Sequence, residues 1–343
     1  MAVALFAQRP LETHNNGIPD MKRTIASLLA ALTLTATAAR AEDDVIRIGN
    51  LKLAHFGAIS YMAEIAPSCG LKIEHKIFAK GLDIMQAIIA GELDAGATAS
   101  EAAISGRAAG TAIYIVAGFA KGGARLVASP ESGIKSVADL KGKKVGVTRG
   151  GIQEVLLAAV LGGAGISSSD QAGKDVQLIY LAYPDLNQAL LNKQIDAMMQ
   201  TEPQSSQAIN NKFGVEVMKP YDTPIGSPVR TLVMTEKIYK EKPAAAQKLL
   251  NCFVKATKTF IDDPATAEKF VKDTLFKGQI SSEDFKAAIG NSPYTMDITP
   301  EHIQATTDTM AKYGIGKMAS PPKAADYVKT DLLAKAKAEA GVK

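Results

Sequence analysis

From residue 45 onward, short apolar runs alternate with longer segments in which apolar residues recur every three or four positions. The runs Val45–Leu51 and Leu71–Phe78 have the length and composition of buried strands, whereas Ala58–Ala66 and Ile84–Ala90 show helical spacing. Strands and helices that alternate in this way are typical of α/β units. We therefore expect a largely parallel sheet covered by helices.

An internal repeat indicates two such units. The segment Ile77–Ala103 can be laid on Ile179–Ser205 with a constant offset of 102 residues and no gap. In each copy a carboxylate and a glutamine three residues later form the pattern of a capping box at a helix start. The alternative is a chance similarity of two amphipathic segments, and the ungapped run of matched capping residues argues against it. The matched positions are Asp83 and Asp185, Gln86 and Gln188, Ala87 and Ala189, Asp94 and Asp196, and Ala95 and Ala197.

A second helix start follows in each copy of the repeat. Ser100 is a good N-cap, and its partner Glu202 precedes Pro203, a residue favoured at the first helical position. Two lobes of like topology then present a strand-to-helix turn at equivalent places.

Two polar segments with proline and glycine, Ser129–Lys144 and Lys219–Arg230, are expected to join the lobes. Residues 42–135 and 226–343 would form lobe I, and residues 136–225 lobe II. Two crossings make a hinge with a cleft, and in open α/β sheets ligands bind beyond the carboxyl ends of the strands. The last third is expected to be mostly helical, with helices at Pro243–Phe260, Pro264–Lys272, Ser282–Ile289, Pro300–Tyr313 and Ala324–Ala340.

The N-terminal segment has the pattern of a secretory signal peptide. Basic residues follow Met21, then come the apolar run Ile25–Thr35 and small residues that end at Ala41. We expect cleavage before Glu42 and a translation start at Met21, with residues 1–20 upstream of it. The apolar run is shorter than the roughly 18 residues that a spanning helix needs, which argues against a membrane anchor. The expected location is the periplasm.

Composition and net charge limit the kinds of partner that the chain is expected to bind. The chain has 343 residues, 47% of them hydrophobic, enough for a sizeable core. Removing residues 1–41 takes away four basic and two acidic side chains, so the net charge falls from +4 to +2. This balance implies neither nucleic acid nor an anionic membrane as a partner. Cys69 and Cys252 either form one disulfide in an oxidising compartment or remain two buried thiols.

The stretch Gly146–Gly165 has the pattern of a strand end, a glycine pair and an apolar helix. A helix that begins after such a turn offers unpaired backbone N–H groups and the positive end of its dipole to an anion. Neither G-x-x-x-x-G-K-[ST] nor G-x-G-x-x-G is matched, so the pattern does not indicate a nucleotide. Metal-ligand spacings and nucleophile motifs such as G-x-S-x-G are also missing, and we expect no metal, no cofactor and no catalytic residue.

Several stretches together resemble the periplasmic solute-binding proteins of ABC importers. The resemblance is to the nitrate/sulfonate/taurine branch, which also includes binders of pyrimidine precursors, and it covers almost the whole mature chain. It implies a type II periplasmic-binding fold, in which two α/β lobes joined by a two-crossing hinge close on a ligand. The stretches are "AKGLDIMQAIIAGELDAGATA", "SGIKSVADLKGKKVGVTRGG", "IDAMMQTEPQSSQA", "DDPATAEKFVKD", "ITPEHIQATTDTMAKYGI" and "ADYVKTDLL".

The resemblance also implies where a ligand binds. Cleft-lining positions of the family match the loop after the first strand and the turn before the helix of the first lobe. They also match the anion-facing turn of the second lobe, where relatives often have hydroxyl residues that this chain lacks, and an acidic residue before proline. The implied ligand-binding residues are His55, Phe56, Thr98, Ser100, Thr148, Arg149, Gly150, Gly151 and Glu202.

Several of these residues could have a role other than ligand binding. Arg149 can bind a carboxylate or sulfonate with two parallel donors, or it can form a salt bridge to Glu202 or remain a solvated charge. Glu202 at a helix start is explained by the helix dipole alone, and facing the ligand it would repel a small bare anion such as nitrate. His55 and Phe56 would stack on a ring or acyl group or form a packed structural pair. His75 and His302 lack partners that would suggest a site.

The expected function is the capture of a small organic acid, a sulfonate or a carboxylate, with or without an aromatic ring, and its delivery to an ABC permease of the inner membrane. The protein is expected to act as a monomer. An enzyme of pyrimidine or quinone precursor biosynthesis on the same fold is the alternative, and a sensor module that docks on a chemoreceptor is a third. The signal peptide argues against the enzyme, because an exported chain lacks the cytosolic precursors that such enzymes use.

Overall fold

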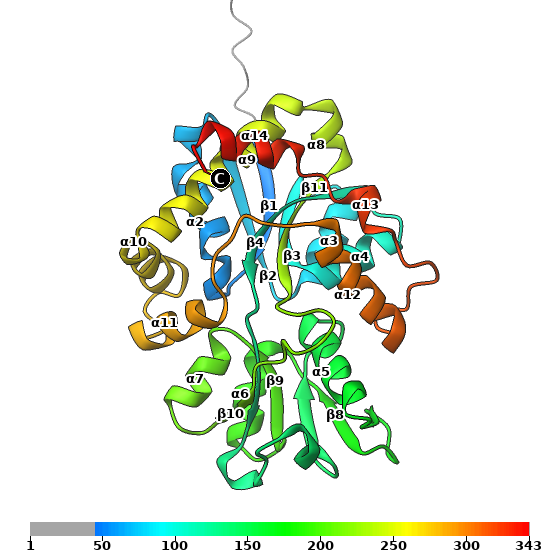
Figure 1. Ribbon diagram of the computed structural model, residues 1–343. Coiled ribbons are helices and arrows are strands. Elements are labelled where there is room, and N and C mark those ends of the chain that lie inside the picture. The colour runs from blue at the N-terminus through cyan, green and yellow to red at the C-terminus, as the bar shows by residue number, and fades with distance from the viewer. Residues whose placement is uncertain (1–44, 343) are drawn as a thin grey trace, which may run out of the picture. The chain divides into compact units, whose positions relative to one another are not determined.

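The computed structural model describes residues 45–342, which form two α/β lobes, each built on its own β-sheet (Figure 1). The expected signal peptide, the start at Met21 and the cleavage site before Glu42 lie outside the described residues. We call the elements on the five-stranded sheet the first lobe and those on the six-stranded sheet the second lobe. Within residues 45–342 no helix combines the length and the apolar composition needed to cross a membrane.

The first sheet has the strand order β2-β1-β3-β11-β4. Strand β1 pairs in parallel with β2 and β3, whereas β11 runs antiparallel to β3 and β4. Strands β3 and β4 are almost entirely buried, which explains their nearly continuous apolar sequence. The strands are β1 (Val45–Leu51), β2 (Lys72–Phe78), β3 (Ala95–Ala99), β4 (Ile113–Lys121) and β11 (Val229–Thr235).

The second sheet has the order β10-β5-β9-β6-β8-β7. Strand β6 is parallel to β8 and β9, and β5 is antiparallel to β9 and β10. Apart from the short β7, this is the order of the first sheet, with β5 in the place of β11. The strands are β5 (Ala124–Ala128), β6 (Lys144–Val147), β7 (Ser168–Ser169), β8 (Val176–Tyr180), β9 (Ala197–Thr201) and β10 (Val215–Met218).

The structure confirms the repeat. Helix α3 (Gly81–Ile89) and strand β3 correspond at the same offset to α6 (Tyr183–Leu191) and β9. Helix α4 (Ser100–Ala108) ends at the same offset as α7 (Gln204–Asn210), which begins two residues later. Asp94 and Asp196 have the same role in the two copies. The Asp94 Oδ2 atom accepts the Arg47 backbone N–H at 2.9 Å, and the Asp196 Oδ2 atom accepts that of Lys144 at 2.8 Å. Each aspartate backbone N–H donates in return to the carbonyl of the same residue.

The predicted helix caps were wrong in detail. Helix α3 begins at Gly81, so Asp83 lies in its first turn, where it interacts with the helix dipole and makes no cap hydrogen bond. Asp185 has the same place in α6. Ser100 is the first residue of α4, and the N-cap position before it is held by Ala99. The Ser100 hydroxyl has no hydrogen-bond partner. Pro203 is the N-cap of α7 rather than its first helical residue.

The chain crosses from the first sheet to the second at Gly122 and Gly123. Strand β4 ends at Lys121 and β5 begins at Ala124, and both glycines have positive φ angles, 73° and 79°, which other residues rarely adopt. This crossing comes earlier than expected, because the polar segment 129–144 joins β5 to β6 within the second sheet. The return crossing lies between β10 and β11, inside the segment expected for it.

The helices predicted for the last third are present (Figure 1). The last one is divided in two, because Val328 leaves the helix to form a parallel bridge with Ile115 of β4. The remaining helices are α2 (Gly57–Ile65), α5 (Ile152–Gly163), α8 (Glu236–Glu241), α9 (Pro243–Asp262), α10 (Pro264–Lys269), α11 (Ser282–Asn291), α12 (Pro300–Tyr313), α13 (Ala324–Tyr327) and α14 (Asp331–Glu339). Short helical turns are η1 (Ala54–Phe56), η2 (Ala66–Cys69), η3 (Pro130–Ser132), η4 (Val137–Leu140) and the π-helix η5 (Phe270–Leu275).

One disulfide bond ties the first lobe together. Cys69 at the end of η2 is bonded to Cys252 in the middle of α9, with the Cα atoms 5.5 Å apart. Of the two alternatives that the sequence left open, the structure has the paired one. Helix α9 also packs against α2, which directly precedes η2, so the disulfide joins segments that are already packed together.

Candidate functional site

A narrow cavity lies where the two lobes meet. Its walls come from the carboxyl ends of β1, β3 and β9, the beginning of β11 and the first turns of α3, α4, α5 and α6. The space open to the centre of a water molecule is only about 20 Å³, enough for about one water. The lining residues are Leu51, Leu53, Phe56, Gly81, Ala99, Glu101, Ile152, Gln153, Tyr183, Thr201 and Arg230. Both lobes therefore contribute to one small chamber.

A wider groove opens next to this cavity. It has a volume of about 540 Å³ and shares Leu51, Leu53 and Tyr183 with the cavity. Its outer part contains Phe276 and Gln279 from the first lobe and amide side chains from the second. The volume is in the range of small-molecule sites. The cavity and the groove together form the cleft that the sequence led us to expect at the carboxyl ends of the strands.

Arg230 supplies the positive charge of the cavity. It lies in β11, is 1% exposed and is the largest fully buried side chain of the described residues. Its Nη2 atom donates to the Gly122 carbonyl at 2.8 Å and its Nε atom donates to His55 Nε2 at 3.3 Å, but its Nη1 atom has no partner. Burial lowers the pKa of Arg230, against the raising effect of the Glu101 charge. A buried guanidinium with an unused donor is suited to an acidic group.

Glu101 supplies the negative charge. It is the second residue of α4, is 4% exposed, and its Oε2 atom has no hydrogen-bond partner. Burial raises the pKa of Glu101 to about 7, against the lowering effects of the Arg230 charge and of nearby backbone N–H groups, including that of Ile152. Ile152 begins α5 of the second lobe. The Glu101 carboxylate therefore reaches from the first lobe to the N-terminus of a helix in the second.

Tyr183 and Gln153 form the wall on the side of the second lobe. Tyr183 begins α6, and its hydroxyl donates to Gln153 Oε1 at 2.7 Å. A Cβ atom at Gly151 would lie 2.3 Å from this hydroxyl, so only glycine fits there. Burial, followed by the charge of Glu101, raises the pKa of Tyr183, which keeps the phenol protonated. The glycine pair of the turn thus makes room for a tyrosine.

The residues expected in the first lobe lie in or directly behind the cavity. Phe56 lines it and packs edge-to-face on Phe119, with ring centroids 4.7 Å apart. His55 lies behind, where its Nε2 atom accepts from Arg230, and burial lowers the pKa of His55 well below its usual value. Thr98 and Ser100 are fully buried with unpartnered hydroxyls, and Thr98 faces Gly81.

The turn 148–151 is occupied by the protein's own groups. The Gly150 N–H donates to Glu154 Oε2 at 2.5 Å, and the Thr148 hydroxyl donates to the Leu181 carbonyl at 2.9 Å. The Arg149 side chain is 63% exposed, pairs with Asp170 at 2.6 Å and stacks on Tyr180. The alternative of a salt bridge between Arg149 and Glu202 was wrong, because each has another partner. Contact of Arg149 with a ligand stays a prediction.

Glu202 is fully buried and its carboxylate is saturated. Its Oε1 atom accepts from Arg125 Nε at 2.7 Å and from Asn291 Nδ2 at 2.8 Å, while its Oε2 atom accepts from the Ser206 hydroxyl at 2.7 Å. Asn291 ends α11 of the first lobe, so Glu202 holds the two lobes together beside the hinge. Direct contact of Glu202 with a ligand also stays a prediction.

Sequence reasoning missed Arg230 and Glu101. Arg230 appeared only as the last residue of a predicted linker, although a charge at the start of the apolar run "VRTLVMT" signals a buried polar contact. Glu101 directly follows Ser100, which was singled out as a cap. Both residues were overlooked because the turn around Arg149 offered a more familiar anion-binding pattern.

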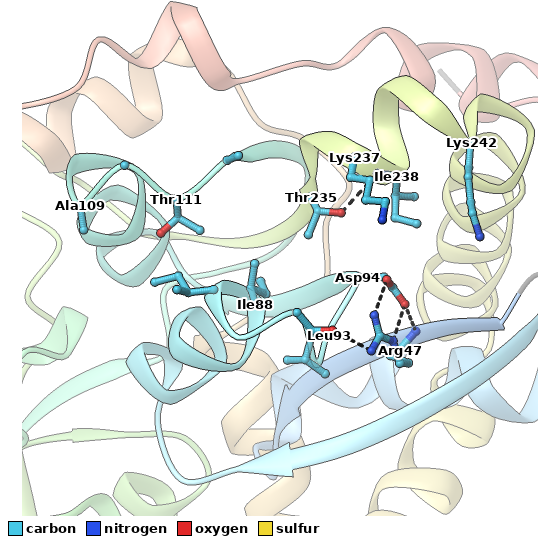
Figure 2. A pocket seen from close by; sticks show the side chains of 14 residues that line it. Arg47, Ile88, Leu93, Asp94, Ala109, Thr111, Thr235, Lys237, Ile238 and Lys242 are labelled. Atoms are coloured by element: carbon cyan, nitrogen blue, oxygen red, sulfur yellow. Dashed lines mark hydrogen bonds and ion pairs between the residues drawn. The ribbon is translucent and has the colours of Figure 1, made fainter.

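A second large pocket lies at the opposite end of the first sheet (Figure 2). It has a volume of about 600 Å³ and lies between the ends of α3 and α4 and the beginning of α8. Arg47 is saturated there by Asp94 and the Gly91 carbonyl, as the dashed lines of Figure 2 show. This pocket is at the amino ends of the parallel strands, whereas ligands of open α/β sheets bind at the carboxyl ends. We therefore place the site in the cleft.

The sequence is similar to a known protein family and to several bacterial binding proteins. A family model described as the NMT1-like family matches residues 40–273. A binding protein of Brucella abortus is 36% identical over 185 residues, which cover 51% of this chain and 54% of that protein. A protein of Escherichia coli named for the binding of aliphatic sulfonates is 32% identical over 209 residues, which cover 58% of this chain and 61% of that protein. The chain thus spans about half the length of the curated relatives that it matches.

The fold is also similar to that of proteins of known structure. The alkanesulfonate-binding protein SsuA from Xanthomonas axonopodis pv. citri, bound to MOPS, matches with a TM-score of 0.70 over 84% of this chain and 99% of that chain. The two sequences are 18% identical, so this likeness concerns the fold alone. The expected type II periplasmic-binding fold is confirmed.

Proposed function

Because the chain belongs to the NMT1-like family, and its relatives are substrate-binding proteins, we propose that it is the extracytoplasmic substrate-binding component of an ABC importer. In this proposal it captures a small organic acid, a carboxylate or a sulfonate, and delivers it to a permease in the inner membrane. The protein acts as a monomer that opens and closes around the hinge at Gly122 and Gly123.

The observation that carries this proposal is the unused donor of Arg230. A guanidinium that is 1% exposed and leaves Nη1 unpartnered is costly unless a ligand supplies an acceptor. A carboxylate or sulfonate is the acceptor that fits a guanidinium best. The position of Arg230 beyond the carboxyl ends of β1 and β3 supports the same assignment.

Closure follows from the division of the site between the lobes. Phe56, Glu101 and Arg230 come from the first lobe, whereas Gln153 and Tyr183 come from the second. An acid bound on Arg230 in the open form gains the contacts of the second lobe only when the lobes approach. This difference in affinity between the two forms drives closure. In this structure the cavity has room for about one water, so an organic acid can enter only when the lobes move apart.

Three features support a periplasmic location. The N-terminal sequence has the signal-peptide pattern, the described residues hold no spanning helix, and Cys69 is bonded to Cys252. Disulfides persist in oxidising compartments such as the periplasm. N-terminal sequencing of the exported protein tests this proposal, with Glu42 as the expected first residue.

A thermal-shift screen tests the function. The purified protein is heated with sulfonates, aromatic and aliphatic carboxylates, pyrimidines and nitrate, because a ligand stabilises only the folded state. We expect stabilisation by organic acids, and a loss of that shift in Arg230→Lys. Stabilisation by neutral pyrimidines alone, or no shift by any acid, would contradict the proposal.

The same samples test the enzyme alternative. A binding protein releases its ligand unchanged, so mass spectrometry after long incubation should recover only the added acid. Among residues 45–342, no group of three or more His, Cys, Asp or Glu side chains is placed to hold a metal ion. A chemically altered ligand would favour the enzyme.

A further inference from the structure

The second sheet is covered by different helices on its two faces. Helix α5 packs on one face, whereas α6 and α7 pack on the other. Strand β9 shows this directly, because successive residues of a strand point to opposite faces. Met199 belongs to the same apolar cluster as Leu161 of α5, and Met198 belongs to the cluster that contains Leu186 of α6. Each face therefore meets the first lobe through its own helices.

Helix α5 meets the first lobe through apolar side chains. Ile152, Val155 and Leu156 of α5 are almost completely buried. They belong to the core cluster of the first lobe rather than to that of the second, together with Ile303 and Met310 of α12. One side of α5 is thus part of the core of the other lobe.

Both ends of α5 are held in the same way. A Cβ atom at Gly162 would lie 2.4 Å from the hydroxyl oxygen of Tyr313 in α12, so glycine allows this ring to lie directly against α5. At the other end, the Ile152 N–H is directed at the buried Glu101 carboxylate of α4. We call the contact of α5 with α4 and α12 the apolar interface.

Helix α7, on the other face of the second sheet, meets α11 of the first lobe through polar groups. Asn210 Nδ2 donates to Asp284 Oδ1 at 2.8 Å, and Gln207 Nε2 donates to the Gln279 carbonyl, next to α11, at 3.4 Å. We call this contact the polar interface. Gln207 and Gln279 also line the groove of about 540 Å³ that leads to the cavity.

Water can replace the contacts of the polar interface. Ala208 of α7 belongs to an apolar cluster of the second lobe and Phe285 of α11 to one of the first, so separation of the two helices leaves both clusters intact. The hydrogen bonds that are lost are exchanged for hydrogen bonds to water, which costs little free energy.

Water cannot replace the contacts of the apolar interface. Separation of α5 from α12 would expose Val155 and Leu156, and the cost of such exposure grows with the apolar area. Domains of one chain move relative to each other unless their interface is large and hydrophobic. The two interfaces therefore differ in how readily they open.

We propose that the lobes separate on one side only, so that α7 moves away from α11 while α5 stays packed on α4 and α12. The groove then widens into the path by which a ligand enters and leaves. Glu202 and Asn291 lie nearest the hinge, since the Gly123 N–H donates to the Asn291 carbonyl. The opening is a property of the protein alone and does not depend on the identity of the ligand.

Two pairs of spin labels test the inference. The variant Asn211→Cys/Lys286→Cys places one label on each side of the polar interface. The variant Gly163→Cys/Lys312→Cys is the matched control across the apolar interface. All four positions are exposed, and a Cβ atom at Gly163 meets no other atom within 4 Å. The two native cysteines are bonded to each other, so only the introduced thiols react.

Double electron–electron resonance on the ligand-free protein measures the distance between the labels of each pair. We expect two distances across the polar interface, one of the closed form and a longer one of the open form, and a single distance across the apolar interface. Circular dichroism checks that both variants are folded. Two distances in the control pair, or a single distance in both pairs, would overturn the inference.

Cross-linking of the same thiols gives a second readout. A short bifunctional thiol reagent across positions 211 and 286 should slow the association of an acid found in the thermal-shift screen at least about tenfold, measured by stopped flow. The cross-link across positions 163 and 312 should leave this rate within about twofold of that of the uncross-linked protein. Equal rates in the two cross-linked variants would contradict opening at α7 and α11. If no acid binds at all, the proposed function fails, and the label distances still decide where the lobes separate.

Discussion

The carboxylate of Glu202 and the guanidinium of Arg125 form a buried ion pair beside the hinge, with Nε and Oε1 2.7 Å apart. Removing one partner would leave the other charge buried and uncompensated. We expect Glu202→Ala to lower the free energy of unfolding by about 3–5 kcal/mol, measured by urea denaturation.

Glu92→Ala is the matched control, because Glu92 pairs with Lys76 on the surface, where both side chains are more than half exposed. Its effect should stay below about 1 kcal/mol. Equal effects in the two variants would show that the pair beside the hinge is not structural. Loss of ligand affinity in Glu202→Gln at unchanged stability would instead show that Glu202 contacts the ligand.

The two arginines of the cleft region should differ in their effect on binding. Arg230 has an unused buried donor, whereas Arg149 pairs with Asp170 on the surface. For an acid found in the screen, we expect Arg230→Lys to weaken binding by about 1.5–3 kcal/mol and Arg149→Ala by less than about 0.5 kcal/mol. Calorimetry of both variants checks this. A loss of 1.5 kcal/mol or more in Arg149→Ala would show that Arg149 contacts the ligand.

Glu101 should make stability depend on pH. Burial raises its pKa from the ordinary value of 4.5 to about 7 in the folded protein, so the folded state binds more protons than the unfolded state between these pH values. Stability from this group is present below about pH 4.5 and is lost as the pH rises towards 7, by on the order of 3 kcal/mol. His55, whose pKa is lowered, acts in the opposite direction, so the comparison must be between the protein and Glu101→Gln.

The measurement is the free energy of unfolding in urea at several pH values from 4.5 to 8. We expect the advantage of Glu101→Gln over the unaltered protein to grow with pH across this window and to be constant above it. A difference that does not vary with pH would mean that Glu101 ionises normally in the folded protein.

The disulfide should contribute measurably to stability. The double variant Cys69→Ala/Cys252→Ala removes a bond that closes a long stretch of chain, since the two residues are 183 apart in sequence. We expect a loss of about 2–5 kcal/mol in the free energy of unfolding. Addition of a reductant should lower the stability of the unaltered protein and leave that of the variant unchanged. Quantitative labelling of two thiols without denaturant would contradict the bond.

Most of the fold could be predicted from the sequence because hydrophobic periodicity and the repeat are local signals. The segment Val45–Leu51 and the helix Pro300–Tyr313 have the predicted bounds. The first crossing was expected later, in the polar segment 129–144, because Gly122 and Gly123 interrupt the strand-like runs on either side for only two residues. Their positive φ angles mark the change of sheet.

The site was harder to predict because its charges depend on which distant segments meet. Nothing in the sequence indicates that Glu101 of α4 reaches the first turn of α5, or that Arg230 of β11 lies against His55. The turn around Arg149 has the expected shape, but Glu154 on the same helix already accepts its Gly150 N–H. Local anion-binding patterns predict free donors only when no nearby carboxylate competes for them.

The paired crossings make the second lobe an insertion into a β-hairpin. All strands of the second sheet come from residues 124–218, whereas Lys121 and Val229 are direct partners in the first sheet. The Gly122 N–H also donates to the Pro228 carbonyl at 2.8 Å, so the chain leaves and re-enters the first lobe through adjacent residues. A short turn in place of residues 123–227 would close β4 and β11 into an ordinary hairpin. The second lobe is thus an insertion at one point of the first, the kind of position at which domain insertion is tolerated.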